Sequence, residues 1–71
     1  MADEIVELMN ELMGYLNQWS WVPDERKDLS NIDNLKWLYK ELVERDRHRR
    51  GDDNAPRAML IIRILVVSME A

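Results

Sequence analysis

The nine residues from Met59 to Val67 read MLIIRILVV, and Arg63 is the only residue among them that is not apolar. A segment that is apolar on nearly every side must be covered on nearly every side. It lies within the last seventeen residues of the chain, so only fifty-four others are available to cover it, and many of those are charged. We therefore expect a second chain to share in the covering, which predicts an obligate oligomer.

The β-branched residues of this stretch are also compatible with a β-strand. A strand needs a neighbour to pair with, and no other part of the sequence has the features of one. We therefore expect residues 55–70 to form a helix, with Pro56 in its first turn, where a missing amide does no harm.

An amphipathic helix is predicted for residues 3–19, because apolar side chains recur there at spacings of three and four. These side chains are Ile5, Leu8, Met9, Leu12, Tyr15, Leu16 and Trp19. Val6 and Met13, seven residues apart, form a second apolar strip beside the first. This helix is therefore expected to touch two neighbours.

Another helix is predicted for residues 31–50, after a polar connector over 20–29. Ser30 followed three residues later by Asp33 resembles a capping arrangement, and Gly51 offers a left-handed cap at the other end. The positions expected to face the core are Ile32, Leu35, Leu38, Tyr39, Leu42 and Val43.

The predicted fold is all-α, with helices at about 3–19, 31–50 and 55–70 in a single domain that forms an intertwined or packed homodimer. A chain of 71 residues without cysteine is in the size range where self-association commonly supplements a small core. Arg63 is expected at the wet edge of the third helix; the alternative is a buried ion pair with Glu70 that fixes the dimer register. The residues expected at the dimer interface are Val6, Met13, Leu60, Ile61, Ile64 and Leu65.

Composition favours a folded chain, since 46% of residues are hydrophobic and only two are glycine and two proline. The net charge of −4 divides into −5 over 1–30, +2 over 31–50 and −1 over 51–71. The acidic beginning is unlike a secretory signal, and the apolar run is shorter than the roughly 20 residues that cross a bilayer. We expect a cytoplasmic protein with no membrane partner.

Trp37 is the residue most suggestive of a binding site. At about 100° per residue it falls nearly opposite the core stripe of its helix, so we expect it to be exposed among charged side chains. An aromatic ring surrounded by charges is typical of a protein-binding epitope; the alternative is packing on the connector or on a second chain. The residues expected to bind a partner are Trp37, Lys40, Glu41, Glu44 and His48.

Four arginines crowd the end of the second helix, where they complement its dipole and are possible phosphate contacts. They are Arg45, Arg47, Arg49 and Arg50. The interspersed Asp46 and the net negative chain weigh against nucleic-acid binding. His48 has no second ligand at a zinc-binding spacing, and no nucleophile stands beside it in sequence. We expect no metal, no cofactor and no enzymatic activity.

These observations predict a small cytosolic protein-binding regulator or inhibitor, of the kind that phages and mobile elements encode to block a host factor such as a transcription regulator. Two alternatives remain open. One is a small nucleic-acid-associated regulator that uses the Arg45–Arg50 cluster, and the other is a structural assembly subunit. A pull-down from cell lysate with and without nuclease separates the first two.

Overall fold

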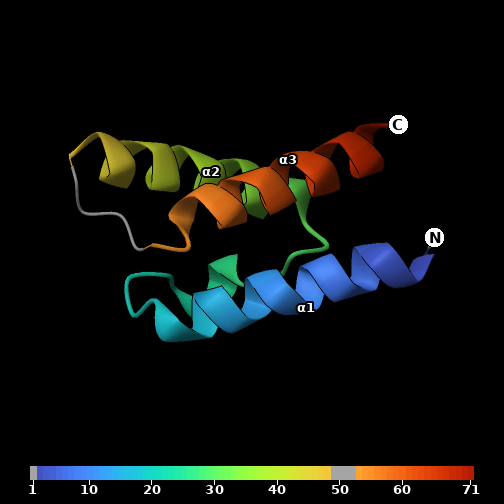
Figure 1. The fold of residues 1–71 in the computed structure, drawn as a ribbon, viewed down its shortest axis with the longest axis horizontal. Coiled ribbons are helices and arrows are strands. Elements are labelled where there is room, and N and C mark those ends of the chain that lie inside the picture. The colour runs from blue at the N-terminus through green and yellow to red at the C-terminus, as the bar shows by residue number, and fades with distance from the viewer. Residues whose placement is uncertain (1, 49–52) are drawn as a thin grey trace.

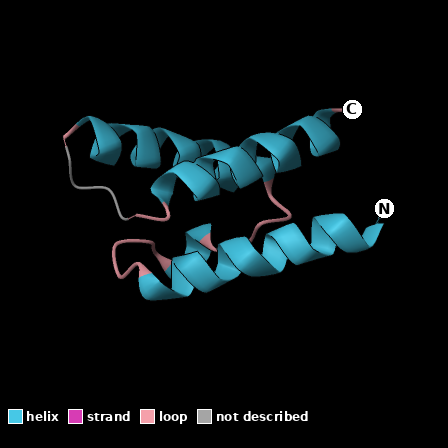
Figure 2. Cartoon of the chain, viewed as in Figure 1, coloured by secondary structure: helices cyan, strands magenta, loops and turns pink. Residues whose placement is uncertain are grey.

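The computed structural model describes residues 2–48 and 53–71, and within them the chain forms three α-helices that pack side by side (Figure 1). The helices are α1 (Ala2–Gln18), α2 (Ile32–Arg47) and α3 (Ala55–Glu70), with a single 3-10 turn, η1 (Asp24–Arg26), in the connector. The all-α prediction is confirmed, and 59–67 is helical. The other described residues form loops and turns (Figure 2).

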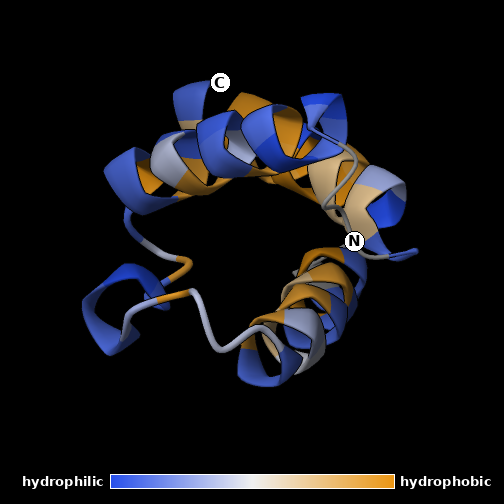
Figure 3. Ribbon diagram, turned by 90° about the vertical axis from the view of Figure 1, so that its left-hand side faces the viewer, coloured by the Kyte–Doolittle hydropathy of each residue, from blue (hydrophilic) through white to orange (hydrophobic). Residues whose placement is uncertain are grey.

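The last helix, α3, is the central element because it packs against both α1 and α2. It runs antiparallel to each, so the first described residues and the last lie at the same end of the bundle (Figure 1). The apolar faces of the helices turn toward one another (Figure 3). Among the described residues, no helix has both the length and the hydropathy needed to cross a bilayer.

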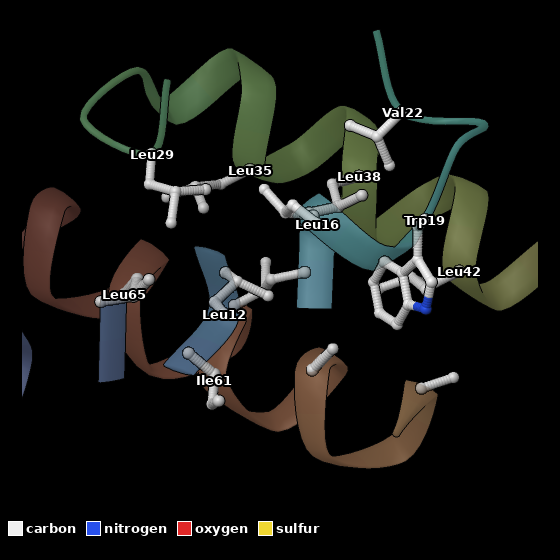
Figure 4. Close-up of a cluster of buried hydrophobic side chains, with 13 residues drawn as sticks. Leu12, Leu16, Trp19, Val22, Leu29, Leu35, Leu38, Leu42, Ile61 and Leu65 are labelled. Carbon is white, nitrogen blue, oxygen red and sulfur yellow. The ribbon is translucent and has the colours of Figure 1, made fainter. Parts of the chain in front are cut away.

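The core combines one face of each of the three helices with two side chains of the connector (Figure 4). Leu12 and Leu16 of α1 are fully buried, and Trp19, just past the end of that helix, is almost so. The buried residues of the core are Leu12, Leu16, Trp19, Val22, Leu29, Leu35, Leu38, Leu42, Ala55, Ala58, Ile61, Ile62 and Leu65. The indole Nε1 of Trp19 has no hydrogen-bond partner among the described residues.

Two of the residues predicted at a dimer interface belong to this core instead. Ile61 is 0% exposed and Leu65 is 3% exposed within a single chain, because α1 and α2 cover that side of α3 by themselves. Neither side chain has surface left for a second copy, and their placement at an interface was wrong.

Asn34 fixes the connector against α2. It is the only buried polar side chain among the described residues. Its Nδ2 donates to the carbonyl oxygens of Glu25 and Asp28, both at 3.2 Å, and its Oδ1 accepts from Nη1 of Arg26 at 3.4 Å. These bonds hold the connector across the bundle, with Leu29 buried beneath it.

The start of α2 differs by one residue from the prediction. Asn31 is the capping residue, and its side chain accepts from the amide of Asp33 at 2.9 Å. Ser30 instead donates to Asp28 Oδ1 through its amide, at 3.1 Å, and through its hydroxyl, at 2.5 Å, which lowers the pKa of Asp28. At its other end α2 stops at Arg47 rather than at 50, and the predicted cap at Gly51 lies outside the described residues.

Gly14 offers a test of the exposed side of α1. It lies inside the helix, and a Cβ added there meets no atom within 4 Å. Gly14→Ala should stabilise the fold by about 0.5–1 kcal/mol, because alanine loses less backbone entropy in a helix. Thermal melts should show a higher Tm. A lower Tm would contradict the conclusion that no other part of the chain packs against α1 at Gly14.

Candidate protein-interaction site

The face of α3 that points away from the core remains apolar. Leu60, Ile64 and Val67 are 46%, 38% and 67% exposed, and their spacing of four and three residues places them on one side of the helix. We call these three residues the α3 strip. Apolar side chains gathered on one exposed face are typical of an interaction surface.

A shallow groove adjoins the α3 strip, between α2 and α3. It has a volume of about 320 Å³ and is mainly apolar; its lining residues are Lys36, Tyr39, Ile62, Arg63, Val66 and Val67. Arg63 is exposed, as expected for a wet edge. Glu70 pairs with Nζ of Lys36 at 3.0 Å, so the alternative of an Arg63–Glu70 pair is not found within the chain.

A bidentate ion pair joins α1 to α3 on the surface. Arg57 donates from Nε to Glu11 Oε2 at 2.8 Å and from Nη2 to Oε1 at 3.1 Å. The hydroxyl of Tyr15 donates to the same Oε2 at 2.5 Å. These bonds, first that from Arg57 and then that from Tyr15, lower the pKa of Glu11 from 4.5 to about 2. The same contacts raise the pKa of Tyr15 and of Arg57.

This pair makes the stability of the fold depend on pH in acid. Because the pKa of Glu11 is lower in the folded chain, its contribution is complete above about 4.5, the unfolded value, and disappears as the pH falls to about 2. Glu11→Gln should lower the Tm by a few degrees near neutral pH, a modest effect because the pair is partly exposed. The difference from wild type should vanish near pH 2.

Thermal melts between pH 7 and pH 2 measure this difference. Glu4→Gln controls for the loss of one exposed negative charge from α1. A Tm difference between wild type and Glu11→Gln that stays constant down to pH 2 would contradict the assignment.

Four aromatic rings form a continuous series of contacts. Tyr15 stacks on Trp19 with ring centroids 6.0 Å apart, Trp19 stacks on Trp21 at 5.5 Å, and Trp21 meets Trp37 at 6.5 Å. We call these four residues the aromatic series. It connects α1, the connector and α2.

Two arginines cover faces of the aromatic series. The guanidinium carbon of Arg45 lies 3.9 Å from the centroid of Trp21, and that of Arg26 lies 5.1 Å from the centroid of Trp37. Both distances are within the range of cation–π attraction. Side chains of the same chain therefore cover part of the aromatic series.

Trp37 is thus not the freely exposed ring that the sequence predicts. It is partly buried and packs against the core, because the connector folds back along its side of α2 and brings Trp21 and Arg26 onto the ring. The alternative of packing on the connector is the one found. An epitope centred on Trp37 remains a proposal, with a smaller free surface.

The other residues expected in that epitope are distributed as follows. Lys40 is exposed. Glu41, Glu44 and His48 line, with Arg45, a hollow of about 150 Å³. Glu44 also lies 3.7 Å from Nε2 of His48. All of these residues have polar or charged side chains, unlike those of the α3 strip.

Of the four arginines predicted as phosphate contacts, the two described ones have partners within the chain. Arg45 covers Trp21, and Arg47 pairs with Glu44 at 3.6 Å. Arg49 and Arg50 lie outside the described residues. A phosphate group would compete with these internal contacts at Arg45 and Arg47, which weakens the nucleic-acid alternative.

Trp37→Ala tests the account of the aromatic series. The ring is partly buried, so its removal should destabilise the fold by about 2 kcal/mol, less than the 3–5 kcal/mol for a fully buried aromatic side chain. Lys40→Ala, three residues along the same helix and exposed, should change stability by about 0.5 kcal/mol or less. Urea unfolding measures both. Equal stability of the two variants would show that the ring is free after all.

The remaining interface predictions, Val6 and Met13, lie on the flank of α1. Val6 is 52% exposed, and Met13 is partly buried against the core. At about 100° per residue, they stand roughly 140° and 160° around the helix from Glu11, which binds α3. The predicted interface therefore divides between different sides of the bundle.

Sequence reasoning missed three parts of this surface: the Glu11–Arg57 pair, the aromatic series and an apolar hollow near the chain ends. The pair joins residues 46 apart in sequence, which helical periodicity cannot detect. The hollow has a volume of about 360 Å³ and is lined by Ile5, Met9, Leu29, Ser30, Leu65, Ser68 and Met69.

No family model, curated protein or solved structure matches this chain. Among the residues that the structure describes, no group of three or more histidine, aspartate or glutamate side chains is placed to hold a metal ion.

Proposed function

We propose that the protein is a small protein-binding regulator that presents the α3 strip to another protein chain, and that it self-associates through this surface. The observation that carries the proposal is the exposure of Leu60, Ile64 and Val67 on the outer side of a helix whose inner side forms the core. Removing these side chains from water is worth roughly 25 cal/mol for each Å² of apolar surface covered, and the entropic cost of association is subtracted from this gain.

The adjoining groove supports the same use of α3. Its apolar lining by Tyr39, Ile62 and Val66 continues the surface of the strip toward α2. Arg63 and Lys36 stand at its edge, which matches the usual interface arrangement of an apolar centre and a polar rim. A helical segment of a partner can lie along such a surface.

Regulation or inhibition is the role that suits a chain of this design. A small helical chain acts on another protein by occupying a surface that the other protein needs. A factor such as a transcription regulator is within the range of partners proposed. The epitope around Trp37 would then be a second, more polar contact region on α2.

Ile64→Asp tests the proposed surface. The side chain lies outside the core cluster, so the substitution should abolish self-association while changing the stability of the single chain by about 1 kcal/mol or less. Ile61→Asp is the matched control, three residues earlier on the same helix. It places a charge at a fully buried position and should unfold the chain, at a cost of several kcal/mol.

Sedimentation and circular dichroism, applied to both variants, measure mass and helix content. A folded Ile64→Asp that associates as strongly as wild type would contradict the proposed surface. A pull-down from nuclease-treated lysate extends the test: a protein retained by wild type and lost from folded Ile64→Asp is the expected result. Capture that depends on nucleic acid would instead favour the alternative.

A further inference from the structure

Two apolar surfaces of the chain differ in charge. The first is the α3 strip. The second consists of the exposed Val6 and the partly buried Met13 on α1, which we call the α1 strip. α1 contains the acidic residues Asp3, Glu4, Glu7 and Glu11 and no basic residue. α3 contains Arg57 and Arg63, with Glu70 as its single acidic residue.

Two of the acidic residues flank the α1 strip. Asp3 is exposed and lies three residues before Val6, on the same side of the helix, and Glu7 is exposed about 100° further around it. Arg63 is exposed between Leu60 and Val67, and none of the described residues forms an ion pair with it. Each strip is therefore apolar with a charged border, negative on α1 and positive on α3.

The positive border disfavours pairing of the α3 strip with itself. Around a two-fold axis the same surface faces its own copy. Because Arg63 lies in the middle of the strip along the helix, such a pairing brings two Arg63 side chains together, and like charges across an interface are costly. Pairing with the α1 strip of another copy instead brings Arg63 toward Asp3 and Glu7.

An apolar recess borders the α1 strip. Met9 lies three residues after Val6 and four before Met13, on the same flank of α1. It lines the hollow of about 360 Å³ described above, together with Ile5 and Met69. An engineered cavity of about 150 Å³ holds a benzene ring, so this recess has room for an apolar side chain of the α3 strip.

The α1 strip stands roughly 140° and 160° around α1 from Glu11, on the flank of Met9 and the hollow, whereas the α3 strip lies on the outer side of α3. A closed two-fold interface contains both strips only if they face the partner together. A contact between unlike surfaces repeats from copy to copy and produces a ring or an open chain.

We propose that the protein associates head to tail, with the α3 strip of one copy seated on the α1 strip and hollow of the next. This inference rests on the proposed use of α3 as an interaction surface. The occupant of the α3 strip is thus a second copy of this chain, and each copy keeps one strip of each kind available for the next.

Complementation between two variants tests the head-to-tail contact. Val6→Asp damages only the α1 strip, and Ile64→Asp damages only the α3 strip; both side chains are exposed, so both variants should stay folded. Each variant alone should be a monomer in sedimentation. An equimolar mixture should form a one-to-one complex of twice the monomer mass, because each variant contributes the strip that the other has lost.

The possible results separate this inference from the proposed function. If wild type is a monomer at every concentration tested, both self-association and the head-to-tail contact are wrong. If wild type and Val6→Asp associate equally, α3 pairs with α3, so the inference is overturned while the proposed surface stands. If both folded variants are monomers and their mixture does not associate, the head-to-tail contact is also overturned.

Arg63→Ala gives an independent test of the charge argument. In the head-to-tail contact it removes an attraction, and association should weaken by about tenfold, the effect of about 1.4 kcal/mol. In a two-fold α3 pairing the same change removes a repulsion, and association should tighten. Tighter association of Arg63→Ala than of wild type would overturn the inference.

Discussion

The structure depends on how far a single short chain can cover α3. This helix is apolar on its inner side, where Ile61 and Ile62 are buried, and on its outer side, where Ile64 and Val67 are exposed. α1 and α2 can each cover one flank only, since a helix presents one stripe to its neighbour. The outer side of α3 therefore stays exposed, and the proposed interaction surface lies there.

A second set of contacts determines which parts of the surface are free. The aromatic series links α1, the connector and α2, while Asn34 binds two connector carbonyls. Together they hold the connector across the side of α2 that carries Trp37. The connector thereby covers the Trp37 ring, which the sequence predicts to be exposed, and the least covered apolar surface is on α3.

Periodicity was enough to predict the helices, because each buries one stripe that recurs every three to four residues. The same reasoning placed Leu12 and Leu16 correctly in the core. It failed for Trp37 because the pattern of α2 describes that helix alone and contains no information about where the connector folds. It also failed for Ile61 and Leu65, since a fully apolar segment has no polar face to indicate which side turns inward.

Contacts between residues distant in sequence could not be predicted from helical periodicity, because such a pattern describes one helix alone. Glu11 and Arg57 were visible as charges, and only the antiparallel packing of α1 on α3 makes them partners. The prediction placed the cap of α2 at Ser30, one residue before the observed cap, Asn31. Both residue types are good caps, and the choice depends on Ser30 being bound to Asp28.

The central claim is that the outer side of α3 is covered by another chain. Sedimentation of the unmodified protein, from low micromolar concentration upward, tests it most directly. We expect a mass that rises with concentration above the 8.5 kDa of one chain, because the α3 strip becomes occupied. A constant mass of 8.5 kDa over the whole range, with α3 fully helical, would contradict it.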